Sequence, residues 1–411
     1  MRRFPLVLCA ALAACAAPAP AERDTPRPAA VELAERQRFA AAETRRSDGF
    51  GDKLAVSGSR LLVGAPRAGD AGSAYTFRFD GGEWQQEATL VPGGAEGSAQ
   101  FGDALALDGD RAVVGASGDG GRGAVYVFDR VDGGWAQTAR LTPADPADDQ
   151  YFGGAVALSG DRLLVGASGD AARRDGPGGY TAEGAAYVFE LAGGAWAQTA
   201  KLAPPPSMAA SGLGWAVALD GGLAVVGGHR DRGVGAVAVY ERGGGGWSPA
   251  AVLRPADGAR FAQFGASLSL SGDRLAVGAS GDGPAREGAV YVYDRAGGAW
   301  AEAARLTDVG GPAEVGFGHA LALDGDRLLV GIPALISQEF RGAVALFARG
   351  ADGWARVDRR VSSDATPLDN FGQSVALSGT TAFVGAGVSY LDERPDVTNT
   401  VYAFALSARG R

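Results

Sequence analysis

Short apolar runs alternate with glycine-rich polar turns along most of this chain. The stretch ALALDGDRAVVGA, residues 104–116, shows the pattern: two apolar runs flank an Asp-Gly pair, a strong short-range signal for a β-hairpin. A polar loop follows, and then the alternating segment AVYVF at 124–128. After a turn with a glycine pair, WAQTARL at 135–141 alternates again. The pattern therefore predicts a unit of four antiparallel strands.

This unit returns seven times. An FG-like pair opens each copy, at Phe50, Phe101, Phe152, Leu213, Phe264, Phe317 and Phe371, with leucine in place of phenylalanine once. Successive pairs are 51 to 61 residues apart, which leaves no room for a separate catalytic domain. Four strands in each of seven repeats predict an all-β fold, a seven-bladed β-propeller with blades arranged radially about a central channel.

The two ends of the repeat region complement each other. A tryptophan opens the fourth strand of six copies, 17 residues before the next FG-like pair, at Trp84, Trp135, Trp196, Trp247, Trp300 and Trp354. Counting 17 residues back from Phe50 gives Leu33, so LAERQRF at 33–39 matches an isolated fourth strand, whereas TVYAFAL at 400–406 stops after a third strand. We expect the N-terminal strand to complete the last blade and close a propeller over residues 32–408, which removes exposed sheet edges. An open solenoid is the alternative.

The first copy carries the residues of a known motif. Its FG pair at Phe50 and its VGAP at 63–66 resemble the FG-GAP repeat, found in the seven-bladed propeller of integrin α-subunits and in many bacterial surface proteins. The resemblance covers residues 33–406 and implies a binding platform, often adhesive, without implying an activity. Many blades of integrin type hold calcium in an Asp-rich loop. The corresponding turns here are the minimal LDGDR or LSGDR, so we carry over no calcium site and expect no cofactor.

The N-terminus has the features of an export signal. Arg2 and Arg3 precede an apolar segment, residues 4–14, which is too short to span a bilayer as a stable helix. The sequence LAAC at 12–15 resembles the lipobox of bacterial lipoproteins, which implies cleavage after residue 14 and a lipid on the thiol of Cys15. A plain signal peptide is the alternative.

The residues after Cys15 extend this expectation. Ala16 stands where an aspartate would retain a lipoprotein in the inner membrane, so the pattern resembles the outer-membrane class. Residues 15–31 are rich in alanine and proline and predict a flexible tether. We expect an exported protein that faces the periplasm or the cell surface.

The amino-acid composition limits the classes of partner and activity that we expect. The 411 residues carry 47 acidic and 38 basic side chains, a net charge of -9, which argues against binding to the phosphates of nucleic acids. The chain has only two histidines, His229 and His319, its two cysteines lie within the first 15 residues, and no known catalytic motif is present. We therefore do not expect an enzyme.

The longest loops all fall on one predicted face. Strand order places the loops between second and third strands together with the inter-blade loops, and the long segments 169–184, 332–342 and 388–400 belong to this face. Rigid scaffolds usually carry binding residues on such loops. The candidate contact residues are aromatic or arginine side chains, which dominate binding energy at interfaces: Tyr180, Phe340, Arg341 and Tyr390.

A second candidate site lies at the mouth of the channel. The residue after each FG-like pair begins the innermost strand, and Asp52, Asp103, His319 and Gln373 come from adjacent blades. This set could bind a metal ion or an amine; a polar lining of a water-filled mouth is the alternative. Trp215 holds the same position in the fourth copy, where it either faces the mouth or packs between blades.

Four aspartates recur four residues after the glycine that ends the second strand. They are Asp119, Asp170, Asp231 and Asp282. Carboxylates on successive blades could bind cations or a basic partner, whereas the structural alternative is that each caps its own turn through backbone N–H groups.

The function that we expect is an exported, lipid-anchored binding or adhesion module, a monomer that recognises a protein, peptide or glycan on its long-loop face. One alternative is an envelope hydrolase or lyase that uses acidic residues at the channel mouth. The other is a structural scaffold of an envelope complex.

Overall fold

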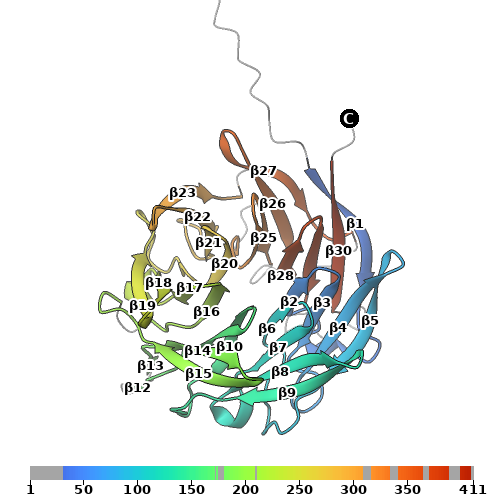
Figure 1. Cartoon of the computed structure of the whole chain (residues 1–411). Helices are drawn as coiled ribbons and strands as arrows, with labels where there is room; N and C mark the ends of the chain where they lie inside the picture. Colours follow the sequence, from blue (N-terminus) through green and yellow to red (C-terminus); the bar gives the residue numbers. More distant parts are fainter. Residues whose placement is uncertain are drawn as a thin grey trace, which may run out of the picture.

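The computed structural model describes residues 31–171, 173–174, 180–208, 211–308, 316–333, 341–363, 370–387 and 399–408. Within these residues the strands form seven four-stranded antiparallel sheets around a central axis, and one additional two-stranded hairpin (Figure 1). No helix in this part of the chain is long and apolar enough to cross a membrane. The predicted all-β, seven-bladed propeller is confirmed.

The first four blades follow the chain in order. Blade 1 contains β2 (Lys53–Ser57), β3 (Arg60–Ala65), β4 (Ser73–Asp80) and β5 (Glu83–Leu90). Blade 2 contains β6 (Ala104–Asp108), β7 (Arg111–Ala116), β8 (Ala124–Val131) and β9 (Gly134–Leu141). Blade 3 contains β10 (Phe152–Ser159), β11 (Arg162–Ala167), β14 (Ala185–Ala192) and β15 (Ala195–Leu202). Blade 4 contains β16 (Ala216–Asp220), β17 (Leu223–Gly228), β18 (Ala236–Gly243) and β19 (Gly246–Leu253).

The last three blades complete the ring. Blade 5 contains β20 (Ser267–Ser271), β21 (Arg274–Ala279), β22 (Ala289–Ala296) and β23 (Ala299–Leu306). Blade 6 contains β24 (Ala320–Asp324), β25 (Arg327–Ile332), β26 (Ala343–Gly350) and β27 (Gly353–Arg360). Blade 7 contains β28 (Phe371–Ser378), β29 (Thr381–Ala386), β30 (Thr400–Ala408) and β1 (Val31–Phe39). The small hairpin is β12 (Arg173–Arg174) with β13 (Tyr180–Thr181), and three short 3-10 turns are η1 (Arg46–Asp48), η2 (Asp119–Gly121) and η3 (Asp231–Gly233).

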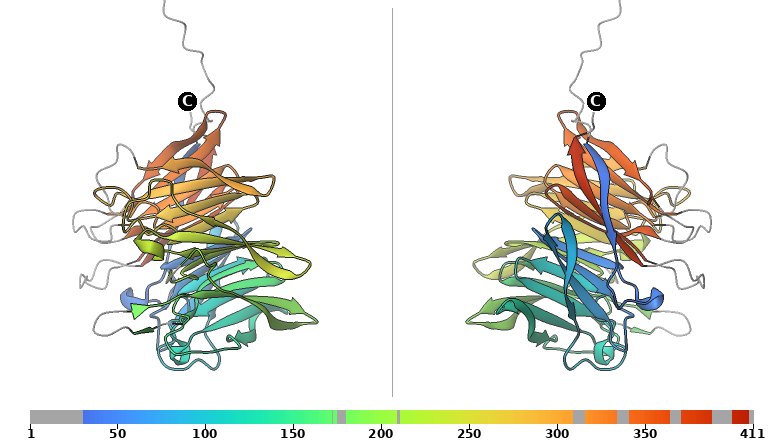
Figure 2. Two further views of the ribbon diagram at one scale, coloured as in Figure 1. Left: turned by 90° about the vertical axis from the view of Figure 1, so that its left-hand side faces the viewer. Right: turned by 90° about the vertical axis from the view of Figure 1, so that its right-hand side faces the viewer.

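The N-terminal strand closes the ring. β1 pairs antiparallel with β30 at the outer edge of blade 7, with Leu33 opposite Leu406 and Phe39 opposite Val401 (Figures 1 and 2). The same register joins the third and fourth strands of blade 2, where Trp135 lies opposite Arg130. The equivalence of Leu33 with the fourth-strand tryptophans, expected from the spacing, is therefore confirmed, and β30 has no open edge.

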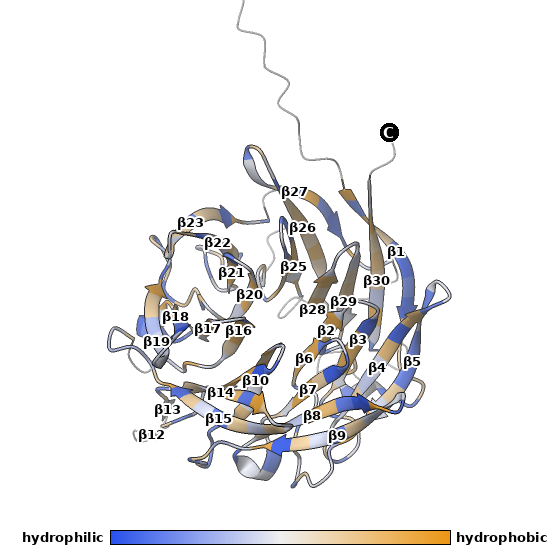
Figure 3. Cartoon of the chain, viewed as in Figure 1, coloured by the Kyte–Doolittle hydropathy of each residue, from blue (hydrophilic) through white to orange (hydrophobic). Residues whose placement is uncertain are grey.

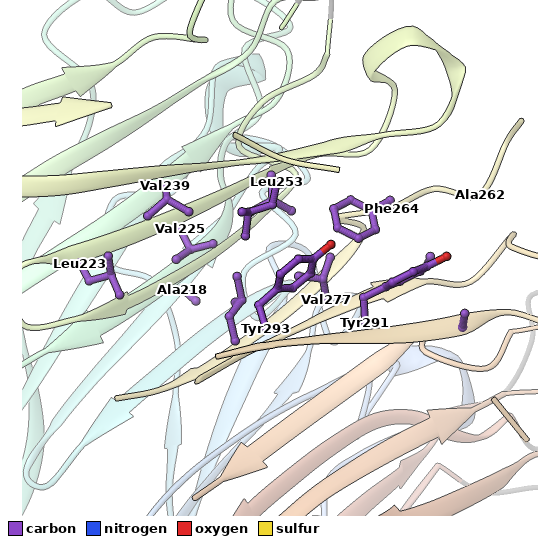
Figure 4. Packing of buried hydrophobic residues seen from close by; sticks show 14 residues of the cluster. Ala218, Leu223, Val225, Val239, Leu253, Ala262, Phe264, Val277, Tyr291 and Tyr293 are labelled. Atoms are coloured by element: carbon purple, nitrogen blue, oxygen red, sulfur yellow. The ribbon is translucent and has the colours of Figure 1, made fainter. Parts of the chain in front are cut away.

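The hydrophobic core is divided among the blade interfaces. Each of seven buried clusters joins two neighbouring blades. In the cluster of Figure 4, Phe264 of the FG-like pair packs edge-on against Tyr291 and Tyr293, with ring centroids 5.4 and 6.3 Å apart, and Val225 and Val239 come from the preceding blade. Tilted and edge-on aromatic pairs of this kind stabilise a core beyond the area that they bury.

The fourth strands face water on one side. In β9 most residues are exposed or half-buried, whereas all but the first residue of β7 are buried. Figure 3 accordingly shows frequent hydrophilic bands on the outer strands. The fourth-strand tryptophans lie at the boundary between the buried core and the exposed surface of the outer strands. Trp84 is buried, and the five others are half-buried and pack against the inter-blade clusters, which supports a packing role for this set.

Two glycines explain why the repeat carries its motif. At the glycine that ends the VG pair of β7, Gly115, a Cβ atom would lie 2.0 Å from the carbonyl oxygen of Gly153, the FG glycine of the next blade. The same contact recurs at 2.0 to 2.2 Å at all seven interfaces, at Gly64, Gly115, Gly166, Gly227, Gly278, Gly331 and Gly385. The last of these meets Gly51, so the motif also joins blade 7 to blade 1. Only glycine allows two backbones to approach so closely.

Candidate functional site

The axial channel contains one large cavity of about 1050 Å³. The innermost strands of all seven blades line it, and so do residues at the ends of the second strands and in the inter-blade loops, such as Tyr151, His229 and Arg230. These residues place the cavity at the face that carries the long loops. A cavity of this size matches the upper range of ligand sites, which are concave and combine apolar walls with a few polar groups.

Of the four residues predicted at the channel mouth, three line this cavity and the fourth contacts one of them. Asp103, His319 and Gln373 line the cavity, and Asp52 lies behind them. Gln373 Nε2 donates to Asp52 Oδ1 at 3.3 Å, and the guanidinium of Arg67 is 2.8 Å from Oδ2. Burial raises the pKa of Asp52, and the Arg67 cation opposes this shift. Arg67 already neutralises the carboxylate of Asp52. This carboxylate therefore has a structural role and is not a free ligand for a cation.

Asp103 and His319 are less completely paired. The hydroxyl of Ser117 donates to Asp103 Oδ2, whereas Oδ1 is buried and has no hydrogen-bond partner among the described residues. Burial raises the pKa of Asp103 to about 6, against the opposing effects of Ser117 and Lys53. Burial, reinforced by the Lys53 cation, lowers the pKa of His319 to about 4, so this imidazole is neutral at pH 7.

Two exposed aromatic residues from blades 3 and 4 line the same cavity. Trp215 is 48% exposed and Tyr151 is 45% exposed, and both line the cavity. The Trp215 ring packs on His229, with centroids 4.4 Å apart and planes inclined by 48°. Of the two placements that the sequence allowed for Trp215, the structure therefore shows the channel mouth. We call Tyr151 and Trp215 the aromatic wall.

The imidazole ring of His229 packs against the indole ring of Trp215. Its Nε2 accepts a hydrogen bond from Arg230 Nε at 3.3 Å, and its Nδ1 is buried without a partner among the described residues. Burial, with a smaller contribution from Arg230, lowers the pKa of His229 to about 4. The ring under Trp215 is therefore neutral at pH 7, and Trp215 rests on an uncharged, partly unsatisfied side chain.

The residue before each FG-like pair has a left-handed backbone in all seven blades, with φ between 48° and 118°. These residues are Gly49, Gln100, Tyr151, Gly212, Gln263, Gly316 and Asn370. A non-glycine residue in this region costs on the order of 1 kcal/mol. Ser117 Oγ lies 3.3 Å from Gln100 Oε1, and Ser280 Oγ donates to Gln263 Oε1 at 2.9 Å. These contacts tie both glutamine side chains to their own blades, whereas the Tyr151 side chain makes no hydrogen bond with a described residue.

The recurring aspartates have partners of another kind. Each is buried and pairs with a basic residue in or just after the fourth strand: Asp119 with Arg140 at 2.9 Å, Asp170 with Lys201 at 2.8 Å, Asp231 with Arg254 at 2.8 Å and Asp282 with Arg305 at 2.7 Å. Tyrosine hydroxyls of the third strand also donate to Asp119 and Asp282, at 2.6 and 2.9 Å. Backbone N–H groups of the preceding inter-blade loop also donate to two of them, Glu96 to Asp119 at 2.8 Å and Ala259 to Asp282 at 3.4 Å. The fixed cations and these contacts favour a structural role.

Metal binding finds little support in the described part of the chain. No group of three or more histidine, cysteine, aspartate or glutamate side chains there is arranged to hold a metal ion. The four aspartates lie in four different blades, each beside its own arginine or lysine. A cation at any of them would have to displace that basic side chain.

The residues predicted on the long loops are described only in part. Arg341 is exposed and directly precedes Gly342, which bridges to Phe371 of blade 7. Tyr180 lies in β13 opposite Arg174, but its side chain lies outside the described part. Phe340, Tyr390 and the lipidation candidate Cys15 also lie outside the described residues.

Sequence reasoning missed four members of the site: Tyr151, His229, Arg230 and Lys53, which all line the cavity. For Tyr151 the sequence did contain a signal. Alignment of the residues before the FG-like pairs gives mainly glycine, glutamine and asparagine, and Tyr151 alone is aromatic. The position of His229 under Trp215 depends on the approach of two loops, which the sequence does not display.

Comparison with protein families agrees with this architecture. The model of the FG-GAP repeat matches residues 33–77, 84–128, 135–189, 196–240, 247–293 and 354–404. Each range begins at Leu33 or a fourth-strand tryptophan and ends in a third strand, and blade 6 lies largely between the last two ranges. No curated protein matches the chain. Because the matched ranges cover well over half of its length, the chain belongs to the FG-GAP repeat family.

Proposed function

We propose that this protein is a binding module that holds a protein, peptide or glycan on its long-loop face, at the mouth of the axial cavity. The observation that carries the proposal is the cavity of about 1050 Å³ with Tyr151 and Trp215 exposed on its wall. Exposed aromatic side chains in a preformed concavity are typical of residues that dominate binding energy.

The rest of the fold supports this role. Seven blades hold the inner strands in one ring, and tight glycine contacts fix each blade against the next. The cavity walls are therefore rigid, so that a ligand loses little free energy in ordering them. Membership of the FG-GAP family fits a binding or scaffold role.

One observation favours the alternative, an envelope hydrolase or lyase. The pKa of Asp103, raised to about 6, suits a general acid near neutral pH. A two-carboxylate mechanism would need a second free acid close by, and Asp52 is engaged by Arg67. For this reason we rank binding above catalysis.

We propose further that the protein is exported and anchored through a lipid on Cys15. The support is the order of a basic start, an apolar segment and LAAC in residues 1–15. In cells grown with labelled palmitate, the wild type should be labelled and should sediment with membranes. Cys15→Ser should remain unlabelled and lose membrane attachment; equal labelling of both proteins would contradict the anchor.

The binding proposal is tested by capture from envelope extract. The full chain is compared with a cavity variant, Tyr151→Gln with Trp215→Ala, and with an opposite-face variant, Phe79→Ser with Val131→Ser. Phe79 and Val131 are also exposed, at 46% and 50%, but lie beside the turns between third and fourth strands. A partner retained by wild type and the opposite-face variant, and lost by the cavity variant, is the expected result. A partner lost only by the opposite-face variant would overturn the proposal.

A further inference from the structure

We propose that the axial cavity binds a pyranose ring of a glycan, stacked on the aromatic wall and hydrogen-bonded by Asp103, His319 and Gln373. This inference rests on the proposed binding function and specifies its ligand class. It is carried by three features of the described residues: two unused aromatic rings, a set of neutral or unsatisfied polar groups, and a mixed distribution of charge.

Tyr151 provides the first of the two aromatic rings. It adopts the left-handed backbone that precedes every FG-like pair, with a φ of 53°. At the same position Gln100 and Gln263 contact serines of their own blades, whereas the Tyr151 hydroxyl makes no hydrogen bond with any described residue. Tyr151 is 45% exposed and lines the cavity. The backbone belongs to a turn of the repeat, in which the Gly154 N–H donates to the Tyr151 carbonyl oxygen at 3.2 Å, so the feature specific to Tyr151 is its exposed aromatic side chain.

Trp215 is the second ring, in the blade that follows. Its indole N–H also has no partner among the described residues, and the residue is 48% exposed. His229 packs beneath it at a centroid distance of 4.4 Å, which holds the ring in place. Two fixed rings on adjacent inner blades suit the flat C–H face of a pyranose, an apolar surface bordered by hydroxyls.

The polar groups come from blades 2, 6 and 7. Asp103 Oδ1 is a buried acceptor without a donor among the described residues, and the neutral imidazole of His319 can donate through one nitrogen and accept through the other. The Gln373 amide uses its Nε2 on Asp52 and keeps Oε1 as an acceptor. A sugar hydroxyl is both donor and acceptor, so it matches the hydrogen-bonding type of each of these groups.

The charges disfavour a simple ion. Lys53 and Arg230 line the same cavity as Asp103, and no salt bridge with a described residue engages either cation. A compact cation would meet Lys53, and a compact anion would meet Asp103. A polyhydroxylated ligand avoids both conflicts, because its hydroxyls accept from the cations and donate to the carboxylate. The cavity of about 1050 Å³ has room for such a ring within a longer glycan.

The test begins with the full chain on a glycan array that displays oligomers of neutral hexoses, N-acetylated hexosamines and uronic acids. The oligomer that binds best is then titrated by isothermal calorimetry against wild type, Tyr151→Gln and Trp215→Ala. Tyr151→Gln places the residue of blades 2 and 5 at the same position, so it should melt no lower than wild type. Phe261→Ser is the control: this aromatic residue is 58% exposed and does not line the cavity.

Wild type and Phe261→Ser should bind the oligomer with similar affinity. Tyr151→Gln and Trp215→Ala should each weaken binding roughly tenfold or more, because each removes one stacking surface. The inference is overturned if no glycan on the array binds, or if both cavity variants bind as tightly as wild type. A peptide or protein captured from the envelope extract through the cavity, with no glycan bound, would reject the sugar and leave the binding function in place. A partner captured equally well by wild type and by the cavity variant would contradict both the sugar proposal and the binding function proposed for the cavity.

Discussion

At the scale of single residues, Asp103 shows how a fixed scaffold changes the chemistry of one side chain. Its Oδ1 is buried without a partner among the described residues, and the Ser117 hydroxyl donates to Oδ2. Desolvation therefore dominates, and the pKa of the carboxyl is raised to about 6, above the value of about 3.9 in an unfolded chain.

This shift predicts a pH dependence of stability. Below about pH 4 the carboxyl is protonated in both states; between about 4 and 6 only the folded state holds the proton, so stability falls as pH rises through this window. Above about 6 the full cost of a buried carboxylate is present. Asp103→Asn removes that cost, so the melting temperature of the variant relative to wild type should increase from pH 4 to pH 7.

The two buried histidines, His229 and His319, change stability with pH in the opposite direction to Asp103. Their folded pKa values of about 4 lie below the unfolded value of about 6.5, so their contributions make the protein more stable as pH rises. Both histidines are present in wild type and in Asp103→Asn, and their effects cancel in the difference. Parallel melting curves across this pH range would contradict the assignment of the raised pKa.

At the scale of strands and blades, the decisive contact is between two backbones. The VG glycine of one blade lies against the FG glycine carbonyl of the next, at every interface of the ring. The two halves of the repeat motif are thus not local turn signals alone; they are the two sides of one inter-blade contact.

Gly115→Ala tests this contact. Its Cβ would lie 2.0 Å from the carbonyl oxygen of Gly153, a backbone atom that can move only if blades 2 and 3 separate. We expect a loss of about 3 kcal/mol in the free energy of unfolding, measured by urea denaturation. The control is Gly244→Ala, where no atom lies within 4 Å of the added Cβ and the change should stay within about 0.5 kcal/mol. Equal effects at the two sites would refute the packing role of the motif.

The blade architecture was predictable because its signals are periodic. Asp-Gly turns, the FG-like pairs and the tryptophans at 17-residue spacing together gave strand number, blade number and the place of Leu33, which the pairing of β1 with β30 confirms. The ion pairs of the recurring aspartates were not foreseen, because Asp119 and Arg140 are 21 residues apart and meet only after the chain has run along β8 and returned along β9. Tyr151 and His229 line the cavity through loop conformations that no repeat in the sequence encodes.

At the scale of the whole molecule, stability depends on a closed ring. β1 covers the edge of β30, and Leu33 is 2% exposed in the cluster between blades 6 and 7. The backbone N–H of Leu33 also donates to Asp358 Oδ2 of blade 6 at 2.7 Å. The first strand of the propeller therefore joins the last two blades.

Truncation separates this strand from the residues before it. Removal of residues 1–30 should leave the melting temperature unchanged, because the first strand begins at Val31. Removal of residues 1–39 exposes the edge of β30 and the apolar residues under Leu33, and should cause aggregation and a lower melting temperature. Light scattering and calorimetry distinguish the two proteins; a stable, monomeric product lacking 1–39 would show that closure is dispensable.

The central claim is that the long-loop face, with the axial cavity at its centre, is the working surface of this propeller. Hydrogen exchange of the full chain, alone and with the envelope component that it retains, tests this claim most directly. We predict protection in the segments 151–156, 211–217 and 228–231, which contribute the aromatic wall and His229. Protection confined to turns on the opposite face, such as 129–134 and 242–247, would contradict the claim.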